Sequence, residues 1–285
     1  MESTSYSSSG ADTCLKCHNR RSKFPVLEIF KSKHANTNDK RTPFSGLQCE
    51  ACHGPGADHV PSVMQDSENK GIINFGRDSS TSIKEQNAMC EQCHRGENQM
   101  HWIGSAHQAA NIACTNCHVI HAGKDPVQHA TTQAKVCYQC HSRQRAEFLK
   151  TSSHPVRFNK MTCSECHSVH DAIGDALLIK NSVNDTCYAC HAEKRGPFLW
   201  EHAPASEDCS LCHRSHGSNH RSLLVKRPPF LCQQCHSSSG HPSIAYSGAG
   251  LPGNSASGFL LAKSCNQCHV QVHGSNHPSG VTLMR

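Results

Sequence analysis

The chain has 285 residues, a formal net charge of +6 and an unusual composition. Leu, Ile, Val and Phe together number 47, about 16% of the chain, which is below the level at which a domain folds on apolar burial alone. Cys and His are abundant instead, with 20 and 24 residues. The composition therefore excludes an ordinary hydrophobic core, and something other than side chains must supply the apolar surface.

All 20 cysteines fall in ten C-x-x-C-H strings, the first starting at Cys14 and the last ending at His269. This string attaches c-type haem, because its two thiols form thioether bonds to the porphyrin and the following histidine binds the iron on the same face. Cys₂His zinc sites would each lack a fourth ligand, and disulfides need no histidine. We therefore predict ten covalently bound haem c groups.

The predicted haem-attaching cysteines are Cys14, Cys17, Cys49, Cys52, Cys90, Cys93, Cys114, Cys117, Cys137, Cys140, Cys163, Cys166, Cys187, Cys190, Cys209, Cys212, Cys232, Cys235, Cys265 and Cys268. The histidines that close the motifs are the predicted proximal iron ligands: His18, His53, His94, His118, His141, His167, His191, His213, His236 and His269.

Ten porphyrins would supply the apolar surface that the sequence lacks, so we expect the chain to fold around them and to be unfolded without them. The predicted fold class is a multihaem cytochrome c. We expect an elongated haem wire with short α-helices at the motifs, mostly loop, and little or no sheet.

The motif spacing predicts a single chain of five dihaem repeats. Motif starts are 22 to 26 residues apart between residues 90 and 232 and farther apart at both ends. Odd-numbered motifs precede a basic stretch and an aromatic residue, whereas most even-numbered motifs lie between two further histidines. The repeats cover about 1–60, 88–122, 135–171, 185–220 and 230–277, a pattern typical of a one-dimensional stack.

Two polar segments, 61–88 and 237–263, interrupt the regular spacing. The second is rich in Gly, Ser and Pro. Both are interpreted as loops that wrap haem edges or as inserts that face a partner, and the sequence leaves the two interpretations open.

Fourteen histidines remain for the second axial position, whereas Met is too rare to fill ten sites. We therefore predict that every iron is bound by two histidines, which leaves no open coordination position. The predicted distal ligands are His34, His59, His107, His121, His154, His170, His202, His216, His241 and His273. The other four are interpreted as surface or propionate-contacting residues, with one of them as an alternative to His241: His101, His129, His220 and His277.

The H-x-x-H strings restrict which histidine serves which iron. His167 and His170 are three residues apart, so on one helical turn they lie on the same face and cannot bind one iron from opposite sides. We therefore expect His170 to bind a neighbouring haem, and likewise His121 and His216. His34 and His59 precede residue 101, so we assign them to the first haems. The repeated string HGSNH aligns His273 with His216.

Haem also changes the charge of the chain. A ferric haem with two ionised propionates carries about −1 and a ferrous one about −2, so ten haems change +6 to roughly −4 or −14. The basic residues are then expected to pair with propionates, and nucleic-acid binding is not expected. No apolar run approaches the length of a membrane-spanning helix. Residues 1–10 lack a basic and an apolar region, and haem c is attached outside the cytoplasm, so we expect the mature form of an exported protein.

The ten motifs, doubled with H-x-x-H strings over the whole chain, resemble the periplasmic decahaem cytochromes of the Mtr type, a group that includes DmsE-like cytochromes. The resemblance implies a periplasmic protein held in an outer-membrane β-barrel porin of a Gram-negative bacterium. It implies electron transfer from periplasmic or inner-membrane cytochromes to an outer-surface multihaem cytochrome, as in extracellular metal respiration. Related subunits serve dimethyl sulfoxide reduction or iron(II) oxidation, so the direction of electron flow stays open.

Two alternatives remain at this point. A freely diffusing periplasmic electron shuttle would use the same haems without a porin. A multihaem reductase would need an iron with an open position, often marked by C-x-x-C-K, which does not occur in this sequence. Since spare histidines exceed the number required by four, we expect a protein that is not an enzyme.

Overall fold

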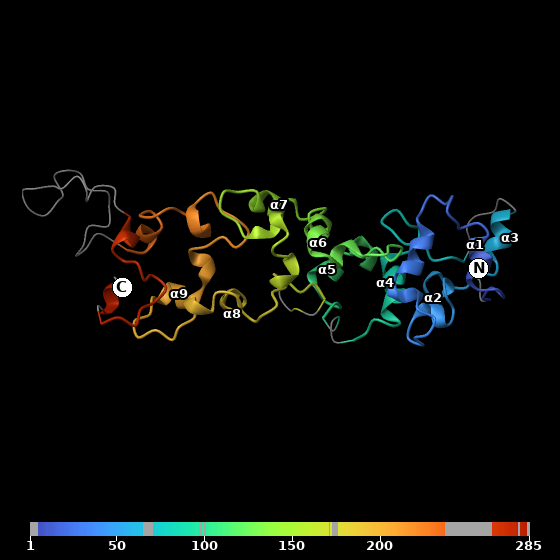
Figure 1. Ribbon diagram of the computed structural model, residues 1–285, viewed down its shortest axis with the longest axis horizontal. Helices are drawn as coiled ribbons and strands as arrows, with labels where there is room; N and C mark the ends of the chain where they lie inside the picture. Colours follow the sequence, from blue (N-terminus) through green and yellow to red (C-terminus); the bar gives the residue numbers. More distant parts are fainter. Residues whose placement is uncertain are drawn as a thin grey trace, which may run out of the picture. The chain divides into compact units, whose positions relative to one another are not determined.

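The computed structural model describes residues 5–64, 71–96, 99, 101–170, 172, 176–236, 264–278 and 280–283 (Figure 1). The chain divides into two compact units. The first comprises Met1–Cys140 with Thr162–Leu177, and the second comprises His141–Met161 with Leu178–Arg285. The attachment cysteines of six motifs belong to the first unit and those of four motifs to the second.

The described residues form short helices joined by loop, with no strand. The α-helices are α1 (Ala11–Leu15), α2 (Glu50–His53), α3 (His59–Met64), α4 (Ile83–Glu91), α5 (Ala106–Ala109), α6 (Ala130–Cys137), α7 (Ser142–Phe148), α8 (Val183–Tyr188) and α9 (Ala203–Glu207). The 3₁₀ helices are η1 (Val26–Lys31), η2 (Lys33–Ala35), η3 (Pro43–Ser45), η5 (Cys114–Asn116), η6 (Pro126–Gln128), η7 (Pro155–Phe158), η8 (Cys163–Glu165), η9 (Ala192–Lys194), η10 (Cys209–Leu211), η11 (Arg221–Leu223), η12 (Cys232–Gln234), η14 (Cys265–Gln267) and η15 (Gly280–Thr282). The prediction of short helices and mostly loop is confirmed.

Many of the helices end at a C-x-x-C-H motif or form part of one. The motifs at Cys14, Cys90, Cys137 and Cys187 begin near the end of an α-helix, whereas four of the even-numbered motifs form a single 3₁₀ turn. Capping starts two of these α-helices: the Ser82 hydroxyl accepts from the N–H of Glu85 in a capping box, and Ser182 accepts from the N–H of Asp185.

Buried side chains are few, as the composition predicts. In the first unit Ala11, Ile29 and Phe44 form a small cluster with partly buried neighbours such as Leu15. Large apolar side chains elsewhere stay exposed, for example Ile103 at 76% and Leu199 at 68%. The polypeptide alone therefore leaves apolar surface uncovered on both units, as expected of a chain that folds around bound porphyrins.

Buried asparagine side chains form hydrogen bonds that join consecutive motifs inside each unit. In the first unit the Asn87 carbonyl oxygen accepts from the N–H of Cys114 at 2.9 Å. In the second unit the Asn184 oxygen accepts from the N–H of Cys209 at 2.7 Å, and its amide nitrogen donates to the carbonyl oxygen of Ser206. Both asparagines lie three residues before an odd-numbered motif, so each links that motif to the next one.

Among the described residues, no helix combines the length and the apolar character needed to cross a lipid bilayer.

Candidate haem-binding sites

The C-x-x-C-H turns share one backbone geometry. In nine motifs the N–H of the histidine donates to the carbonyl oxygen of the first cysteine at 2.9 to 3.0 Å. In all ten motifs the N–H of the second cysteine donates to the carbonyl oxygen of the first cysteine at 3.1 to 3.2 Å. Such a closed turn brings two sulfurs and one imidazole to the same side, as attachment to a single porphyrin face requires.

Seven of the proximal histidines face a second histidine inside the same unit. The ring centroids are 5.9 to 6.4 Å apart. The pairs are His18–His59, His34–His94, His53–His121, His118–His170, His154–His191, His202–His236 and His213–His273.

This separation matches two imidazoles on opposite sides of one iron. Two metal–nitrogen bonds of about 2 Å, plus the distance from nitrogen to ring centre on each side, put the centroids about 6 Å apart. No group of three or more metal-binding side chains occurs in the part of the chain that the structure describes. A haem iron needs only two protein ligands, because the porphyrin supplies the other four nitrogens, so the residues present fit c-type haem.

The H-x-x-H turn at residues 118–121 contributes to two different pairs. In the turn at residues 118–121, His118 faces His170 whereas His121 faces His53. His170 likewise faces the fourth motif and not His167 of its own motif. His18 of the first motif faces His59. His94 of the third motif faces His34, so His34 lies beside the third motif.

The imidazoles are held by hydrogen bonds at their Nδ1 atoms. In six of them Nδ1–H donates to a backbone carbonyl oxygen at 2.5 to 2.9 Å, which leaves Nε2 free for a metal. These bonds join His53 with Ile73, His154 with Ser215, His167 with Ala176, His202 with Val272, His213 with Ser222 and His269 with Thr282. Metal-binding histidines typically show this arrangement, because the bond fixes both the tautomer and the ring orientation.

Two imidazoles donate to carboxylates instead, which the sequence reasoning missed. The Nδ1 atom of His118 lies 2.5 Å from the Oδ2 atom of Asp125, and that of His216 lies 3.2 Å from the Oε2 atom of Glu147. Asp125 is further held by the N–H of Val119 at 3.1 Å. No spacing rule in the sequence marks these two carboxylates, since backbone turns bring them to the rings.

Burial favours the neutral form of several of these imidazoles, which is the form that binds a metal. It lowers the pKa below the ordinary value in His34, His53, His121 and His273. In His34 and His121 the pKa is lowered further by the facing ring of the pair, because two protonated imidazoles would repel each other.

Neighbouring motifs are in contact through their cysteines. The thiols of the first cysteines of two successive motifs are joined by a hydrogen bond, and the bond from Cys49 lowers the pKa of Cys14 to about 7. The pairs are Cys14–Cys49, Cys90–Cys114, Cys137–Cys163, Cys187–Cys209 and Cys232–Cys265. The second cysteine of an even-numbered motif lies near the second cysteine of the next motif in three cases: Cys52–Cys93, Cys117–Cys140 and Cys212–Cys235. Attachment sites therefore follow one another closely within each unit, alternating between the two kinds of contact.

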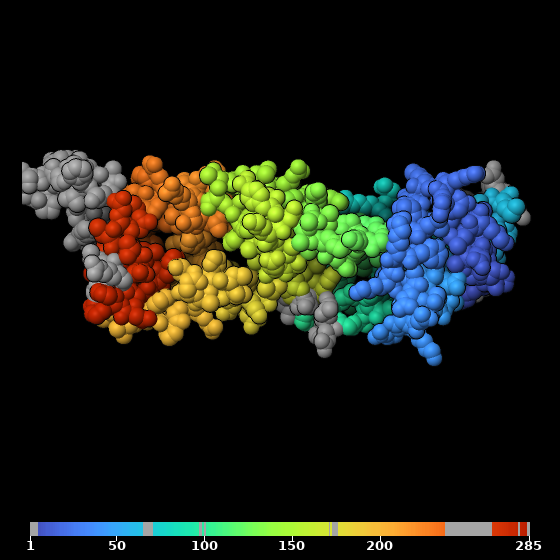
Figure 2. All heavy atoms as spheres, viewed as in Figure 1, coloured from blue at the N-terminus to red at the C-terminus, as the bar shows by residue number. Residues whose placement is uncertain are grey.

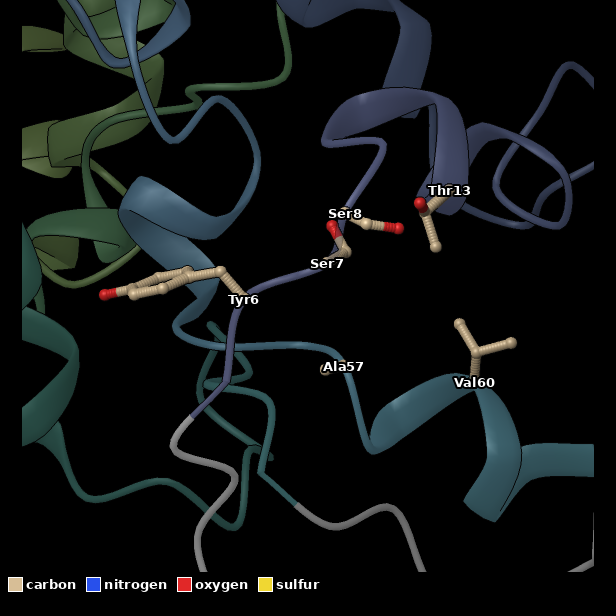
Figure 3. Close-up of a pocket in the computed structure, with 6 residues that line it drawn as sticks. All are labelled: Tyr6, Ser7, Ser8, Thr13, Ala57 and Val60. Carbon is tan, nitrogen blue, oxygen red and sulfur yellow. The ribbon is translucent and has the colours of Figure 1, made fainter.

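A cavity of about 320 Å³ opens beside the first motif (Figure 3). Two of its lining residues adjoin the first site in sequence, since Thr13 precedes Cys14 and Val60 follows His59. None of its lining residues is charged. Its lining residues are Tyr6, Ser7, Ser8, Thr13, Ala57 and Val60.

The predicted cysteines and proximal histidines all lie in described segments. Among the predicted distal histidines, His241 lies outside the described residues, as does the segment 237–263. The other nine are described, and seven of them belong to the facing pairs above. His107 and His216 complete that set of nine.

Successive haem-attachment turns with facing imidazole pairs define a multihaem c-type cytochrome. Residues 154–196 and 202–241 match a family model described as a doubled CXXCH motif, and residues 49–136 match the model of the cytochrome c-type protein NrfB-like family. The chain is 48% identical over 98% of its length to the multiheme cytochrome MtrA of Shewanella baltica, and the match covers 83% of that protein. The chain therefore belongs to the MtrA family of multihaem cytochromes, and its motifs bind c-type haem covalently.

More distant relatives match parts of the chain. The cytochrome c-type protein NrfB of Haemophilus influenzae is 26% identical over 46% of this chain and 65% of its own length. The C-type polyheme cytochrome OmcB of Geobacter sulfurreducens is 25% identical over 55% of this chain and 23% of its own length. All three relatives are cytochromes by name.

Proposed function

We propose that this chain conducts electrons across the outer membrane of a Gram-negative bacterium through ten covalently bound haems. The observation that carries the proposal is the succession of facing imidazole pairs joined by neighbouring attachment cysteines. When bound, each haem supplies one-electron redox chemistry at its iron. The chain's own residues hold the haems in sequence and set their surroundings.

Both axial positions of every iron are occupied by histidine in this proposal. The seven facing pairs support it, and His107, His216 and His241 complete the distal set. Because two imidazoles leave no open position, such sites suit electron transfer and exclude direct binding of a substrate to iron. The Nδ1 hydrogen bonds hold each ring in place, so little has to move when an electron arrives or leaves.

The chain is built from five dihaem repeats, at about 1–60, 88–122, 135–171, 185–220 and 230–277. Each hydrogen-bonded pair of first cysteines falls inside one of these repeats, which supports the division. Asn87 and Asn184 each lie one residue before a repeat, and each accepts a hydrogen bond from the second motif of that repeat. The repeat is therefore the unit that brings two haems together.

The chain lies in the periplasm, held within an outer-membrane β-barrel porin. It takes up electrons from periplasmic or inner-membrane cytochromes and passes them to an outer-surface multihaem cytochrome, in extracellular metal respiration. Membership of the MtrA family supports this placement. The alternative without a porin is a periplasmic shuttle, and the two differ in whether a barrel is bound.

The test is affinity purification of the haem-loaded chain from outer membranes, followed by reconstitution in liposomes. We expect a β-barrel protein to co-purify, and electrons from a dye reductant sealed inside the liposomes to reduce an external ferric acceptor. A chain lacking the His170 imidazole (His170→Met) should conduct more slowly with its haem number unchanged. Purification without any barrel, together with free exchange of electrons in the soluble periplasmic fraction, would favour the shuttle.

A further inference from the structure

The positive charge of the chain is concentrated in residues 16–41, called here the cationic segment. This segment contains eight Lys and Arg and two acidic residues, whereas the rest of the chain contains 20 residues of each sign. The whole formal net charge of +6 therefore lies in this segment. It forms part of the first unit and lies on the surface of that unit in Figure 2, at the blue end of the colour bar.

The basic side chains of the segment are available for an external partner. All eight are exposed. Its two acidic residues are already engaged, Glu28 with Lys31 at 2.7 Å and Asp39 with Arg41 at 2.8 Å. The six basic residues other than Lys31 and Arg41 form no ion pair with any described residue: Lys16, Arg20, Arg21, Lys23, Lys33 and Lys40.

The cationic segment surrounds the first haem site. It contains Cys17 and His18, both exposed, which belong to the first attachment turn. At its other end His34 faces His94 of the third motif. The exposed Phe24 ring, with the Lys23 ammonium 5.8 Å from its centroid, adds an apolar contact between the cations.

Haem propionates do not account for this charge. The four propionates of the first and third haems, whose sites adjoin the segment, would pair with at most four of the six free cations and leave two in addition to the cations already paired with Glu28 and Asp39. Nine further haems, at about −1 each when oxidised, make the remainder of the loaded chain negative, because its own formal charges cancel. The charge of the loaded protein is thus strongly asymmetric, with its positive surface beside the first and third haem sites.

We propose that the cationic segment is a docking surface for an acidic one-electron carrier protein that exchanges electrons with the first haem. This rests on the proposed function, because it names the kind of partner that meets one end of the haem series. Transient electron-transfer complexes use small surfaces, and complementary charge speeds the encounter more than it strengthens the complex. In each transfer the carrier loses one electron and the chain gains one.

The test uses the haem-loaded full chain in stopped-flow reduction by two donors. Reduced flavodoxin is the acidic protein donor. Reduced lumiflavin, at mildly acidic pH where it is uncharged, is the small donor. The variant Arg20→Glu/Arg21→Glu/Lys23→Glu is compared with the matched control Arg221→Glu/Lys226→Glu/Arg227→Glu, whose exposed cations include Arg227 against the Phe230 ring. Lys33→Glu/Lys40→Glu is a second variant of the segment, for use if the first does not take up ten haems.

At low ionic strength we expect flavodoxin to reduce the segment variant at least about tenfold more slowly than the parent chain. The parent rate should fall as salt is added, and the variant should lose most of this dependence. The control variant should keep the parent rate with flavodoxin, and lumiflavin should reduce all three chains equally fast.

Several results would overturn the docking surface. Flavodoxin rates that stay unchanged in the segment variants, or that fall as much in the control, would do so. Slower reduction by both donors with shifted haem potentials would show that the cations pair with propionates. A variant that keeps its flavodoxin rate but no longer sediments with phosphatidylglycerol vesicles would assign the segment to a lipid surface. A parent chain that accepts electrons from neither donor would instead refute the proposed function itself.

Discussion

At the scale of single residues, the Nδ1 partners divide the imidazoles into two kinds. Six donate to a backbone carbonyl oxygen, whereas His118 and His216 donate to the carboxylates of Asp125 and Glu147. A carboxylate partner makes the imidazole a stronger electron donor to a bound metal, which favours the ferric state. The fourth haem, held by His118, is therefore expected to have a lower potential than its neighbours.

Asp125→Asn tests this tuning. The amide oxygen can still accept the Nδ1 hydrogen bond but the negative charge is lost, so we expect one haem of the ten to titrate at a higher potential, by at least a tenfold change in its redox equilibrium, about 59 mV for one electron. Spectroelectrochemical titration measures this. Asp39→Asn is the control, because Asp39 pairs with Arg41 on the surface. An unchanged curve for Asp125→Asn would contradict the role of the carboxylate.

The facing pairs also predict which haem responds to the loss of a distal ligand. His170→Met should affect the haem attached at Cys114 and Cys117, because His170 faces His118. A thioether ligand raises the potential relative to a second imidazole, so that haem should titrate higher and show the near-infrared absorption of a Met–His haem. The number of bound haems should remain ten.

The control for this variant is His129→Met, since His129 is interpreted as a surface or propionate-contacting residue and, as an alternative to His241, would not serve the haem of Cys114 and Cys117. Assigning the altered haem to the peptide that carries it shows which attachment site has changed. An effect on the haem of Cys163 and Cys166, whose own histidine is His167, would contradict the pairing across the H-x-x-H turn.

At the scale of elements, hydrogen bonds between motifs position the short helices, and side-chain packing contributes little. Asn184, 7% exposed, joins α8 to the turn of η10 by accepting from the N–H of Cys209. It also donates to two carbonyl oxygens near the end of α9. Removing a buried amide leaves these backbone groups without their partner.

Asn184→Ala is therefore expected to destabilise the haem-loaded chain by about 1–3 kcal/mol. Urea unfolding followed by far-ultraviolet circular dichroism should show a lower midpoint. Asn181→Ala, on an exposed residue three positions earlier, should leave the midpoint in place. Equal midpoints for the two variants would mean that the tie contributes nothing to stability.

At the scale of the whole molecule, the bound haems replace a hydrophobic core. The buried apolar side chains in the described residues are few, and large ones such as Ile103 and Phe158 stay exposed. Covalent attachment binds the cofactor to the chain before folding is complete, so folding and haem loading are coupled.

The intact mass and the pyridine haemochrome assay should both give ten haems per chain, with no thiol reactive toward alkylating reagents. A count of eight or fewer would contradict the assignment of every C-x-x-C-H string to a haem. Chain produced without haem attachment is expected to be unfolded by circular dichroism, because its apolar surface has no partner. Production in the cytoplasm, outside which haem c is attached, supplies this haem-free chain.

The attachment sites could be predicted from the sequence because their chemistry is local. Two cysteines and a histidine within five residues close one turn, so all 20 cysteines and ten proximal histidines were predicted without a fold. The shortage of Leu, Ile, Val and Phe predicted the loop-rich chain equally directly. The assignment of His170 to a neighbouring haem was predicted by assuming that His167 and His170 lie on one helical turn. The structure corrects that premise, because residues 167–170 lie outside any helix, although His170 does face His118 of another motif.

The partners of those sites depend on tertiary structure. His121 faces His53 and His34 faces His94 because loops bring distant segments together, and no spacing rule specifies which segments meet. The Nδ1 acceptors are mostly backbone carbonyl oxygens, which every residue possesses, so the sequence cannot mark them. Even Asp125, a short distance along the chain from His118, becomes a partner only through the turn that carries it back to the ring. Covalent attachment is a property of a short string, whereas axial pairing and its electrostatic tuning are properties of how the chain folds.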